Sequence, residues 1–416
     1  MGSWKKVLTV AVSLLVALGA AGQYRYPVSI NEMLSNSMSE RPQLKKMDEK
    51  IDSFLTFWGI RGASLSIMRG DSLLFSKGYG WADKEKGRRM EPGTTMRLAS
   101  VSKLLTAVGI MTLQEKGLLS IQSPVFGPYG ILGEYDPYIR DDNYYLITVE
   151  HLLRHQGGFT RRFGDPMFST QALMRQHGLK SPPDAGTILR TQLPYRLDFE
   201  PGTSTYYSNF GYLLLSMIIE KVSGKSYEEF MQEEVFGKAG CYDFHIAGNY
   251  YKDRHKGESR YYMQADSEPV SDISGNGNLV EKCYGGNDLT TLSGAGAWVG
   301  STPELARIVA SIDGILRIPD ILGFFSIYQM TQRLGDDIYP LGWIDATAEG
   351  ELTRTGSFSG TSALIKYYPD GECWIMVTNT STWRGSRFTK NTSAFFNKLR
   401  PRFSDKLPKQ DLFVKR

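Results

Sequence analysis

Two residues of the stretch LASVSKLL, Ser100 and Lys103, have the types and the spacing that acyl transfer requires. A serine hydroxyl becomes a nucleophile when a base lies within reach, a cation holds that base ionised, and backbone N–H groups await the oxyanion. Residues three apart on a helix share a face, so Lys103 returns beneath Ser100 at a helix start, where free N–H groups also lie. By itself the stretch also fits two polar residues on a helix surface.

Two later motifs supply further groups for such a site. EPGTSTYYSN places Tyr207 and Asn209 two apart, directly before an apolar helical segment. LTRTGSFSG adds a cation and small residues at the end of a predicted strand, namely Arg354, Thr355, Gly356 and Ser357.

The order Ser-x-x-Lys, Tyr-x-Asn, basic residue-Thr-Gly resembles the serine β-lactamase and penicillin-binding protein superfamily. The similar branch is the class C β-lactamase-related family of esterases, D-amino peptidases and DD-carboxypeptidases. The resemblance runs from about residue 45 to 396 and includes the turn HQGGF, the block FGYLLLSMIIEKVSGKSYEEF and the stretch GAGAWVGSTPELA. Separate motifs in order, at suitable separations, make it specific to this family.

The resemblance implies three catalytic residues. Ser100 would be the acylated nucleophile, Lys103 the lysine that helps to deprotonate it, and Tyr207 the general base and later proton donor. The pKa of a free tyrosine is about 10, so Tyr207 needs nearby cations to be a useful base at neutral pH. Lys103 and Arg354 would favour its ionised form by charge.

The resemblance also implies a substrate-binding wall. Asn209 would orient the substrate amide, and the backbone N–H groups of Ser100 and Ser357 would form the oxyanion hole. The remaining wall residues would be Arg354, Thr355 and Gly356. No metal and no organic cofactor are expected.

Two positions depart from the family pattern. Arg354 stands where the family usually has Lys or His, and an arginine cannot carry a proton because it stays charged. It can still polarise Tyr207 and hold a substrate carboxylate through two parallel bonds. HQGG at 155–158 stands where family members commonly read H-T-S-G, which affects a loop hydrogen bond rather than the chemistry.

Several other residues invite a functional interpretation but are better explained as structural. Ser102 lies on a different helical face from Ser100 and is interpreted as structural or substrate-facing. His151 and His155 have metal-ligand spacing, but the pattern lacks the glutamate of H-E-x-x-H, so we interpret them as buried or capping residues. The tyrosines at 242–262 line a cleft or pack a long loop.

The elements that must position these residues divide the chain. An amphipathic helix is predicted over 43–60, followed by strands at 63–69 and 72–80 and the helix that begins near Ser100. Four further helices are predicted, over residues 149–155, 210–224, 302–314 and 387–399. Late strands are predicted over 339–344, 351–356, 361–368 and 372–379.

Strands near both ends of the chain with helices between them predict an α+β fold, an antiparallel sheet flanked by helices with an inserted all-α domain. The catalytic domain is predicted over 43–400, in two parts. Its α/β part covers about 43–117 and 295–400, and its helical part covers about 118–294. A C-terminal tail would cover 401–416. The junction between the two parts is the natural cleft.

The N-terminus has the pattern of a secretory signal peptide over 1–22, in which MGSWKK precedes an apolar run and small residues. An extension over 23–42 would follow. The mature protein is therefore expected to be secreted or periplasmic, with no stable membrane span, although an uncleaved anchor is an alternative. Cys241 and Cys283 could pair, but three cysteines are an odd number, and Cys373 is expected to be a buried thiol.

Composition narrows the function further. The chain has 416 residues, a formal charge of +4 and scattered lysines, so no nucleic-acid surface is expected. The leading hypothesis is an exported serine hydrolase that acts on a small-molecule or peptide substrate, including cell-wall material. The alternatives are a β-lactamase or penicillin-binding DD-carboxypeptidase, and a catalytically silent member that binds cell-wall material. The oligomeric state is left open.

Overall fold

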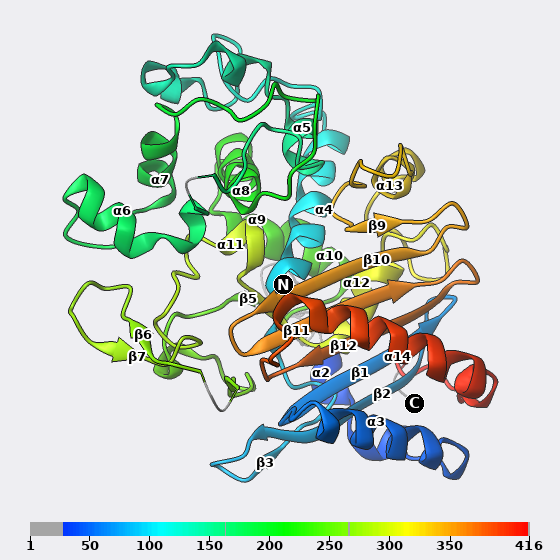
Figure 1. The fold of residues 1–416 in the computed structure, drawn as a ribbon. Helices are drawn as coiled ribbons and strands as arrows, with labels where there is room; N and C mark the ends of the chain where they lie inside the picture. The colour runs from blue at the N-terminus through cyan, green and yellow to red at the C-terminus, as the bar shows by residue number, and fades with distance from the viewer. Residues whose placement is uncertain (1–27, 163, 265–266, 415–416) are drawn as a thin grey trace, which may run out of the picture.

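The early and late strands of the chain join in one antiparallel sheet (Figure 1). The computed structural model describes residues 28–162, 164–264 and 267–414. The signal peptide predicted over 1–22 lies outside these residues. The strand order is β3-β2-β1-β12-β11-β10-β9. The bounds are β1 Gly62–Arg69, β2 Ser72–Asp83, β3 Arg88–Arg89, β9 Asp345–Ala346, β10 Leu352–Phe358, β11 Thr361–Tyr367 and β12 Glu372–Thr378.

The pairing of β1 with β12 joins the early and late strands into one open sheet, although the two segments lie about 300 residues apart in the chain. Hairpins supply the neighbouring pairs β1–β2, β10–β11 and β11–β12. Asp71 at the first turn has φ of 62°, as the predicted Gly-Asp turn requires. The two ends of the chain therefore cannot form separate domains.

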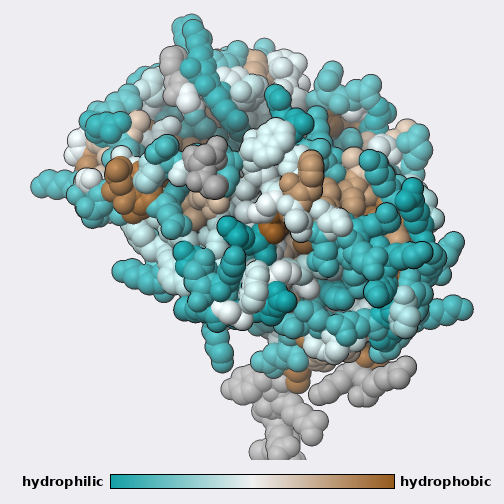
Figure 2. All heavy atoms as spheres, turned by 60° about the horizontal axis from the view of Figure 1, so that its bottom comes forward, coloured by the Kyte–Doolittle hydropathy of each residue, from teal (hydrophilic) through white to brown (hydrophobic). Residues whose placement is uncertain are grey.

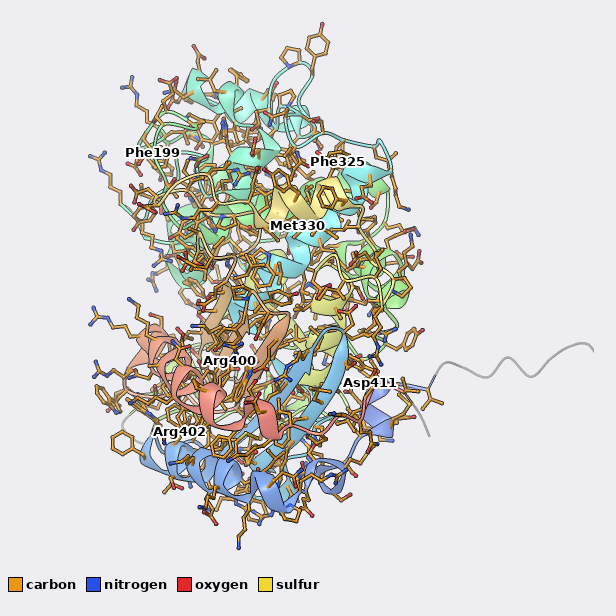
Figure 3. The ribbon with its side chains drawn as sticks, turned by 90° about the vertical axis from the view of Figure 1, so that its right-hand side faces the viewer. Phe199, Phe325, Met330, Arg400, Arg402 and Asp411 are labelled. Carbon is orange, nitrogen blue, oxygen red and sulfur yellow. The ribbon has the colours of Figure 1, made fainter. Side chains whose placement is uncertain are left out.

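Helices cover both faces of the sheet. Because side chains alternate along a strand, Ala63, Leu65 and Ile67 of β1 face a core shared with α3 (Lys45–Phe57) and α14 (Phe388–Phe403). Figure 3 marks α14 by Arg400 and Arg402. Arg400 Nε donates to Glu372 Oε1 at 3.2 Å, which ties the helix to β12.

The opposite face carries the larger core and the helices that reach the cleft. Helix α12 (Thr302–Ala310) packs on β1 and β12, while α4 (Ser102–Glu115) and α8 (Asn209–Ser223) pack on each other. Ser208 caps α8 by accepting from the Gly211 N–H at 3.1 Å, and Gly224 ends the helix with φ of 69°.

The remaining helices and strands are short, and they lie in both the α/β part and the helical part of the molecule. The other helices are α2 Ile30–Met33, α5 Val149–Leu153, α6 Thr170–His177, α7 Ala185–Gln192, α9 Tyr227–Met231, α10 Gly237–Ala239, α11 Ser293–Gly296 and α13 Phe324–Thr331. The other strands are β4 Met96–Arg97, β5 His245–Ile246, β6 Val270–Ser271, β7 Leu279–Val280 and β8 Trp298–Gly300. The helical part thus carries short strands that the sequence did not predict.

The predicted strand over 339–344 is wrong. That segment is irregular, and the strand that pairs with β10 is the two-residue β9 that follows it. Pro340 lacks an N–H, and Gly342 has φ of 81°. A Cβ on Gly342 would lie 2.7 Å from the Ala107 Cβ, so the segment crosses α4 too closely for a regular strand.

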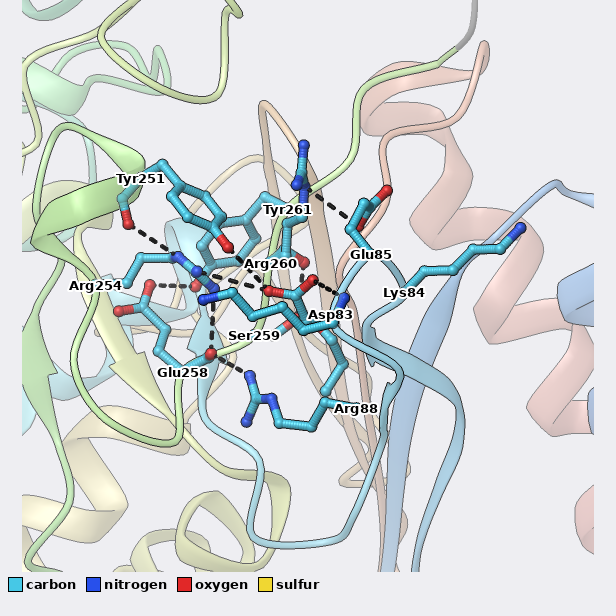
Figure 4. Close-up of polar contacts among 12 residues, drawn as sticks. Asp83, Lys84, Glu85, Arg88, Tyr251, Arg254, Glu258, Ser259, Arg260 and Tyr261 are labelled. Carbon is cyan, nitrogen blue, oxygen red and sulfur yellow. Dashed lines mark hydrogen bonds and ion pairs between the residues drawn. The ribbon is translucent and has the colours of Figure 1, made fainter.

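The long segment 241–292 has little regular structure beyond the short strands β5, β6 and β7, and polar contacts such as those in Figure 4 also hold it in place. Arg97 is buried, donates to the Cys283 and Gly248 carbonyls at 2.7 and 2.9 Å, and stacks on Tyr261. Tyr251 donates to Asp83 at 3.1 Å. These tyrosines of the 242–262 cluster therefore anchor the loop.

The cysteines and the surface complete the description. All three cysteines are free and buried, so Cys241 and Cys283 do not pair. Figure 2 shows hydrophilic side chains over most of the face that it presents, with apolar ones in small separate areas. Across the described ranges, every helix falls short of the length and apolarity that crossing a membrane takes.

Packing of α14 on the sheet predicts a large effect at its buried stripe. Phe396 is fully buried, with its ring 5.3 Å from that of Trp374. We expect Phe396→Ala to lower the free energy of unfolding by about 3 kcal/mol or more, because it removes buried area and leaves a cavity. Urea denaturation measures this. Phe57→Ala, at a side chain 78% exposed, should change it by less than about 0.5 kcal/mol; equal losses would contradict the packing described.

Candidate active site

Ser100 lies at the front of α4, as the sequence predicts, in the short 3₁₀ turn Ala99–Val101. Ala99 has φ of 48°, a left-handed conformation that a residue with a Cβ rarely adopts. This local strain turns the chain sharply from β4 into the helix and presents Ser100 to a cleft of about 370 Å³.

Lys103 comes back beneath Ser100 and is fully buried. Its Nζ donates to Ser100 Oγ at 3.2 Å, to Asn209 Oδ1 at 2.8 Å and to the Ala295 carbonyl at 2.6 Å. These three acceptors match the three protons of an ammonium group. Burial nevertheless lowers the pKa of Lys103 to about 8.

Tyr207 stands just before α8 and faces two cations. Its ring lies 4.9 Å from Lys103 Nζ, and Arg354 Nη2 donates to its hydroxyl oxygen at 3.1 Å. Burial on its own raises the pKa of Tyr207, but the charges of Lys103 and Arg354 outweigh burial and bring it down to about 7. Tyr207 is thus able to accept a proton near neutral pH.

Arg354 faces the catalytic groups rather than the open cleft. The side chain is fully buried, and its Nε donates to the Ser100 carbonyl at 2.8 Å. Its Nη1 has no hydrogen-bond partner among the described residues. The prediction that Arg354 polarises Tyr207 fits this geometry, whereas the prediction that it holds a substrate carboxylate does not, because its fork is turned inward.

Strand β10 forms the wall beside Ser100. A Cβ on Gly356 would lie 2.3 Å from the Leu98 carbonyl oxygen and 3.1 Å from Ser100 N, so only glycine allows this approach. Strand β9 pairs with β10 only at Leu352 and Thr353. On the side of β10 that faces away from β11, residues 355–357 have no strand partner in the described ranges, which leaves their backbone groups on that side for a ligand.

The structure brings the predicted residues to one place. The cleft is lined by Ser100, Tyr207, Asn209, Thr355, Gly356 and Ser357. Lys103 and Arg354 lie buried behind this lining. Phe168 and Phe358 meet with ring centroids 6.1 Å apart, so an aromatic pair joins the helical part to β10 at the cleft.

His155 backs the site as a neutral ring. Its Nδ1 accepts from the Ser208 N–H at 3.1 Å, and its ring centroid lies 4.3 Å from that of Tyr207, with the two planes tilted by 33°. Burial and the Lys103 and Arg354 charges hold the pKa of His155 well below its usual range. The turn HQGGF therefore supports Tyr207 through this histidine.

The other structural interpretations are also confirmed. His151 forms a capping box with Thr148 at the start of α5. Ser102 is buried and its Oγ accepts from the Trp298 N–H at 3.1 Å, so it is structural.

Sequence reasoning missed two charged residues, Arg161 and Asp165. Asp165 accepts from Asn209 Nδ2 at 2.7 Å, and Arg161 lines the cleft and pairs loosely with Asp165 at 3.6 Å. The only signal was the charged run FTRRFGD directly after the HQGG turn.

The antiparallel sheet, the inserted helical part and the cleft that holds Ser100, Lys103 and Tyr207 define a protein of the β-lactamase/transpeptidase fold. The model of the beta-lactamase family matches residues 47–396. The chain belongs to this family, whose members are serine hydrolases.

Individual relatives are more distant. Penicillin-binding protein 4* of Bacillus subtilis (strain 168) is 33% identical over 179 residues, which cover 43% of this chain and 36% of that protein. Esterase EstB of Burkholderia gladioli is 28% identical over 183 residues, 43% of this chain and 45% of the esterase. The matched segments thus span less than half of either relative.

A solved structure shares the fold over nearly its full length. The D-amino acid amidase from Ochrobactrum anthropi SV3, complexed with L-phenylalanine, superposes with a TM-score of 0.65 at 20% identity. The match covers 86% of this chain and 99% of the amidase. The identity is low enough that this likeness concerns the fold alone.

The two cations beside Tyr207 predict an unusual tyrosine titration. The ultraviolet absorbance of tyrosinate should show one residue ionising with a pKa of about 7, absent in Tyr207→Phe. Lys103→Met removes a cation and should raise that pKa. Tyr212→Phe is the matched control, since burial raises the pKa of Tyr212. A wild-type titration without any transition near neutral pH would refute the electrostatic description of the site.

Proposed function

We propose that this protein is an exported serine hydrolase that cleaves a small ester, amide or peptide bond through an acyl-enzyme on Ser100. The observation that carries the proposal is the contact of Ser100 Oγ with Lys103 Nζ at 3.2 Å beside Tyr207, whose pKa is about 7. A nucleophile, an ionisable base and fixed cations are the parts that acyl transfer needs.

The proposed reaction begins with proton transfer from Ser100 to ionised Tyr207 as Ser100 Oγ attacks the substrate carbonyl. The resulting oxyanion is held by the N–H groups of Ser100 and Ser357. Tyr207 then gives the proton to the leaving group, which departs as the acyl-enzyme forms. Water then attacks the acyl carbonyl while Tyr207 takes one of its protons. The bond to Ser100 Oγ breaks, Tyr207 returns the proton to that oxygen, and the acid leaves, which restores Ser100 and ionised Tyr207.

Lys103 and Arg354 keep their charges through this cycle. Their part is to stabilise the phenolate form of Tyr207, and Asn209, held by Lys103 at 2.8 Å, offers its amide edge to the substrate. The cycle needs no metal and no organic cofactor.

The substrate class and the location rest on separate supports. Relatives are named as a penicillin-binding protein and an esterase, which favours an acyl donor, including a peptide from the cell wall. The predicted signal peptide over 1–22 supports action outside the cytoplasm. The name of the penicillin-binding relative also favours a second candidate, a penicillin-binding DD-carboxypeptidase or β-lactamase.

A covalent probe separates these candidates. We expect a fluorophosphonate to add its mass to wild-type protein, and Ser100→Ala to add none, by intact mass spectrometry. Ser102→Ala, the neighbouring control, should still be labelled. A persistent penicillin adduct at Ser100 would favour the penicillin-binding candidate. Rapid loss of that adduct, with release of ring-opened penicillin, would favour a β-lactamase. Labelling of Ser100→Ala, or no adduct on folded wild type, would refute the proposal.

The inward position of Arg354 leads to a second prediction. Arg354→Ala should lower kcat/KM about 100-fold, and by similar factors, on a neutral nitrophenyl ester and on the same ester bearing a carboxylate, because the cation acts on Tyr207 in both reactions. Arg402→Ala, on the exposed side of α14, is the control and should change neither. A loss confined to the carboxylate-bearing ester would instead assign Arg354 to substrate binding.

A further inference from the structure

A carboxylate stands at the far end of the hydrogen bonds that hold Lys103. Asn209 Oδ1 accepts from Lys103 Nζ at 2.8 Å, while Asn209 Nδ2 donates to Asp165 Oδ2 at 2.7 Å. The Asn209 amide therefore links an ammonium to a carboxylate: its oxygen, the negative end, faces Lys103, and its NH₂ group, the positive end, faces Asp165. The Asp165 side chain is only 10% exposed, so this carboxylate is shielded from water.

The amide of Asn209 has no preference of its own for this orientation. An amide group is nearly symmetric in shape, and its oxygen and nitrogen exchange places on rotation. A carboxylate only accepts hydrogen bonds, so Asp165 fixes which end faces it. Rotation would turn an N–H toward the Lys103 ammonium, where two donors would meet.

Charge at the site also requires a second anion. Lys103 and Arg354 are two fully buried cations, and ionised Tyr207 balances one of them. Asp165 brings the cluster to neutrality, which limits the cost of burying it. Burial lowers the pKa of Lys103, and the charge of Asp165 acts in the opposite direction.

We infer that Asp165 is a positioning residue for the proposed reaction: its carboxylate fixes the amide of Asn209 and, through that amide, keeps Lys103 in the ammonium form that Tyr207 needs. The inference rests on the proposed function, which assigns the chemistry to Ser100 and Tyr207.

Four other groups face Lys103. Tyr207, Arg354 and neutral His155 approach it from three separate segments. The ring of Tyr212 on α8 lies 5.5 Å from Lys103 Nζ and stays un-ionised, because burial raises the pKa of Tyr212. Arg161 approaches Asp165 from the cleft, with Nε at 3.6 Å and a side chain 50% exposed, so solvent screens its charge.

Asp165 also has a structural contact that decides the choice of variant. Its Oδ1 accepts from the Met167 N–H at 3.1 Å and caps the short turn Pro166–Phe168. Asparagine caps as well as aspartate does and has nearly the same shape. Asp165→Asn thus removes the charge and keeps the cap.

The matched control is Asp198→Asn. Asp198 lines the same pocket as Asp165, accepts from Thr160 Oγ1 and pairs with Arg162 at 3.7 Å, but makes no hydrogen bond to Asn209 in the described ranges. Both variants lose one carboxylate from neighbouring loops, and only one of them loses the link to Lys103.

The experiment measures kcat/KM against pH on a neutral nitrophenyl ester, together with the tyrosinate absorbance of Tyr207. In Asp165→Asn, loss of the negative charge eases deprotonation of both Lys103 and Tyr207, so both limbs of the profile should move to lower pH. We expect a shift of about half a pH unit or more and a loss of about 10-fold at the alkaline side. Asp198→Asn should keep the wild-type profile within about twofold.

Each outcome bears on a distinct claim. The role of Asp165 would be overturned if kcat/KM of Asp165→Asn fell while its pH dependence stayed in place. It would also be overturned if the pH profiles of Asp165→Asn and Asp198→Asn changed equally. If wild-type protein shows no Ser100-dependent turnover, the proposed function fails, and the absorbance titration still tests Asp165. A lower pKa of Tyr207 in Asp165→Asn alone supports the inference, and an unchanged pKa overturns it.

Discussion

The site depends on keeping the Lys103 ammonium charged where water does not reach it. An isolated buried charge costs several kcal/mol, and it persists only with acceptors and opposite charge around it. Lys103 obtains its acceptors from three separate segments, through Ser100, Asn209 and the Ala295 carbonyl. The proposed chemistry therefore depends on the packing of α4, α8 and α11 on one another.

The sheet meets a second requirement, the close approach of β10 to the nucleophile. Alternation along the strand turns Arg354 and Gly356 inward, toward the turn that holds Ser100, while Thr355 and Ser357 face the cleft. One residue of slip in the β10–β11 register would exchange these two sets. Strand β11 also pairs with β12, and β12 with β1, so β10 belongs to a sheet that both ends of the chain build.

Much of this was predictable from sequence because it depends on local patterns. The strands on either side of the 70–71 turn, the helix that begins near Ser100 and the capped helix before Gly224 all follow from periodicity and turn residues. The segment 339–344 failed because its apolar pattern fits a strand, whereas its path is set by contact with Ala107. Asp165 was missed because its partner Asn209 is 44 residues away and no spacing rule joins them.

Arginine at position 354 changes how protons can move here. Its guanidinium stays charged, so within the described cluster the exchangeable protons belong to Ser100, Lys103 and Tyr207. The pKa values of Lys103 and Tyr207, about 8 and about 7, lie close together, and two such coupled groups titrate as a pair. A permanent cation on one side and a shielded carboxylate on the other favour the charged form of that pair, ammonium with phenolate, over the neutral one. In this chain the fixed charges thus take the place of a third titrating group.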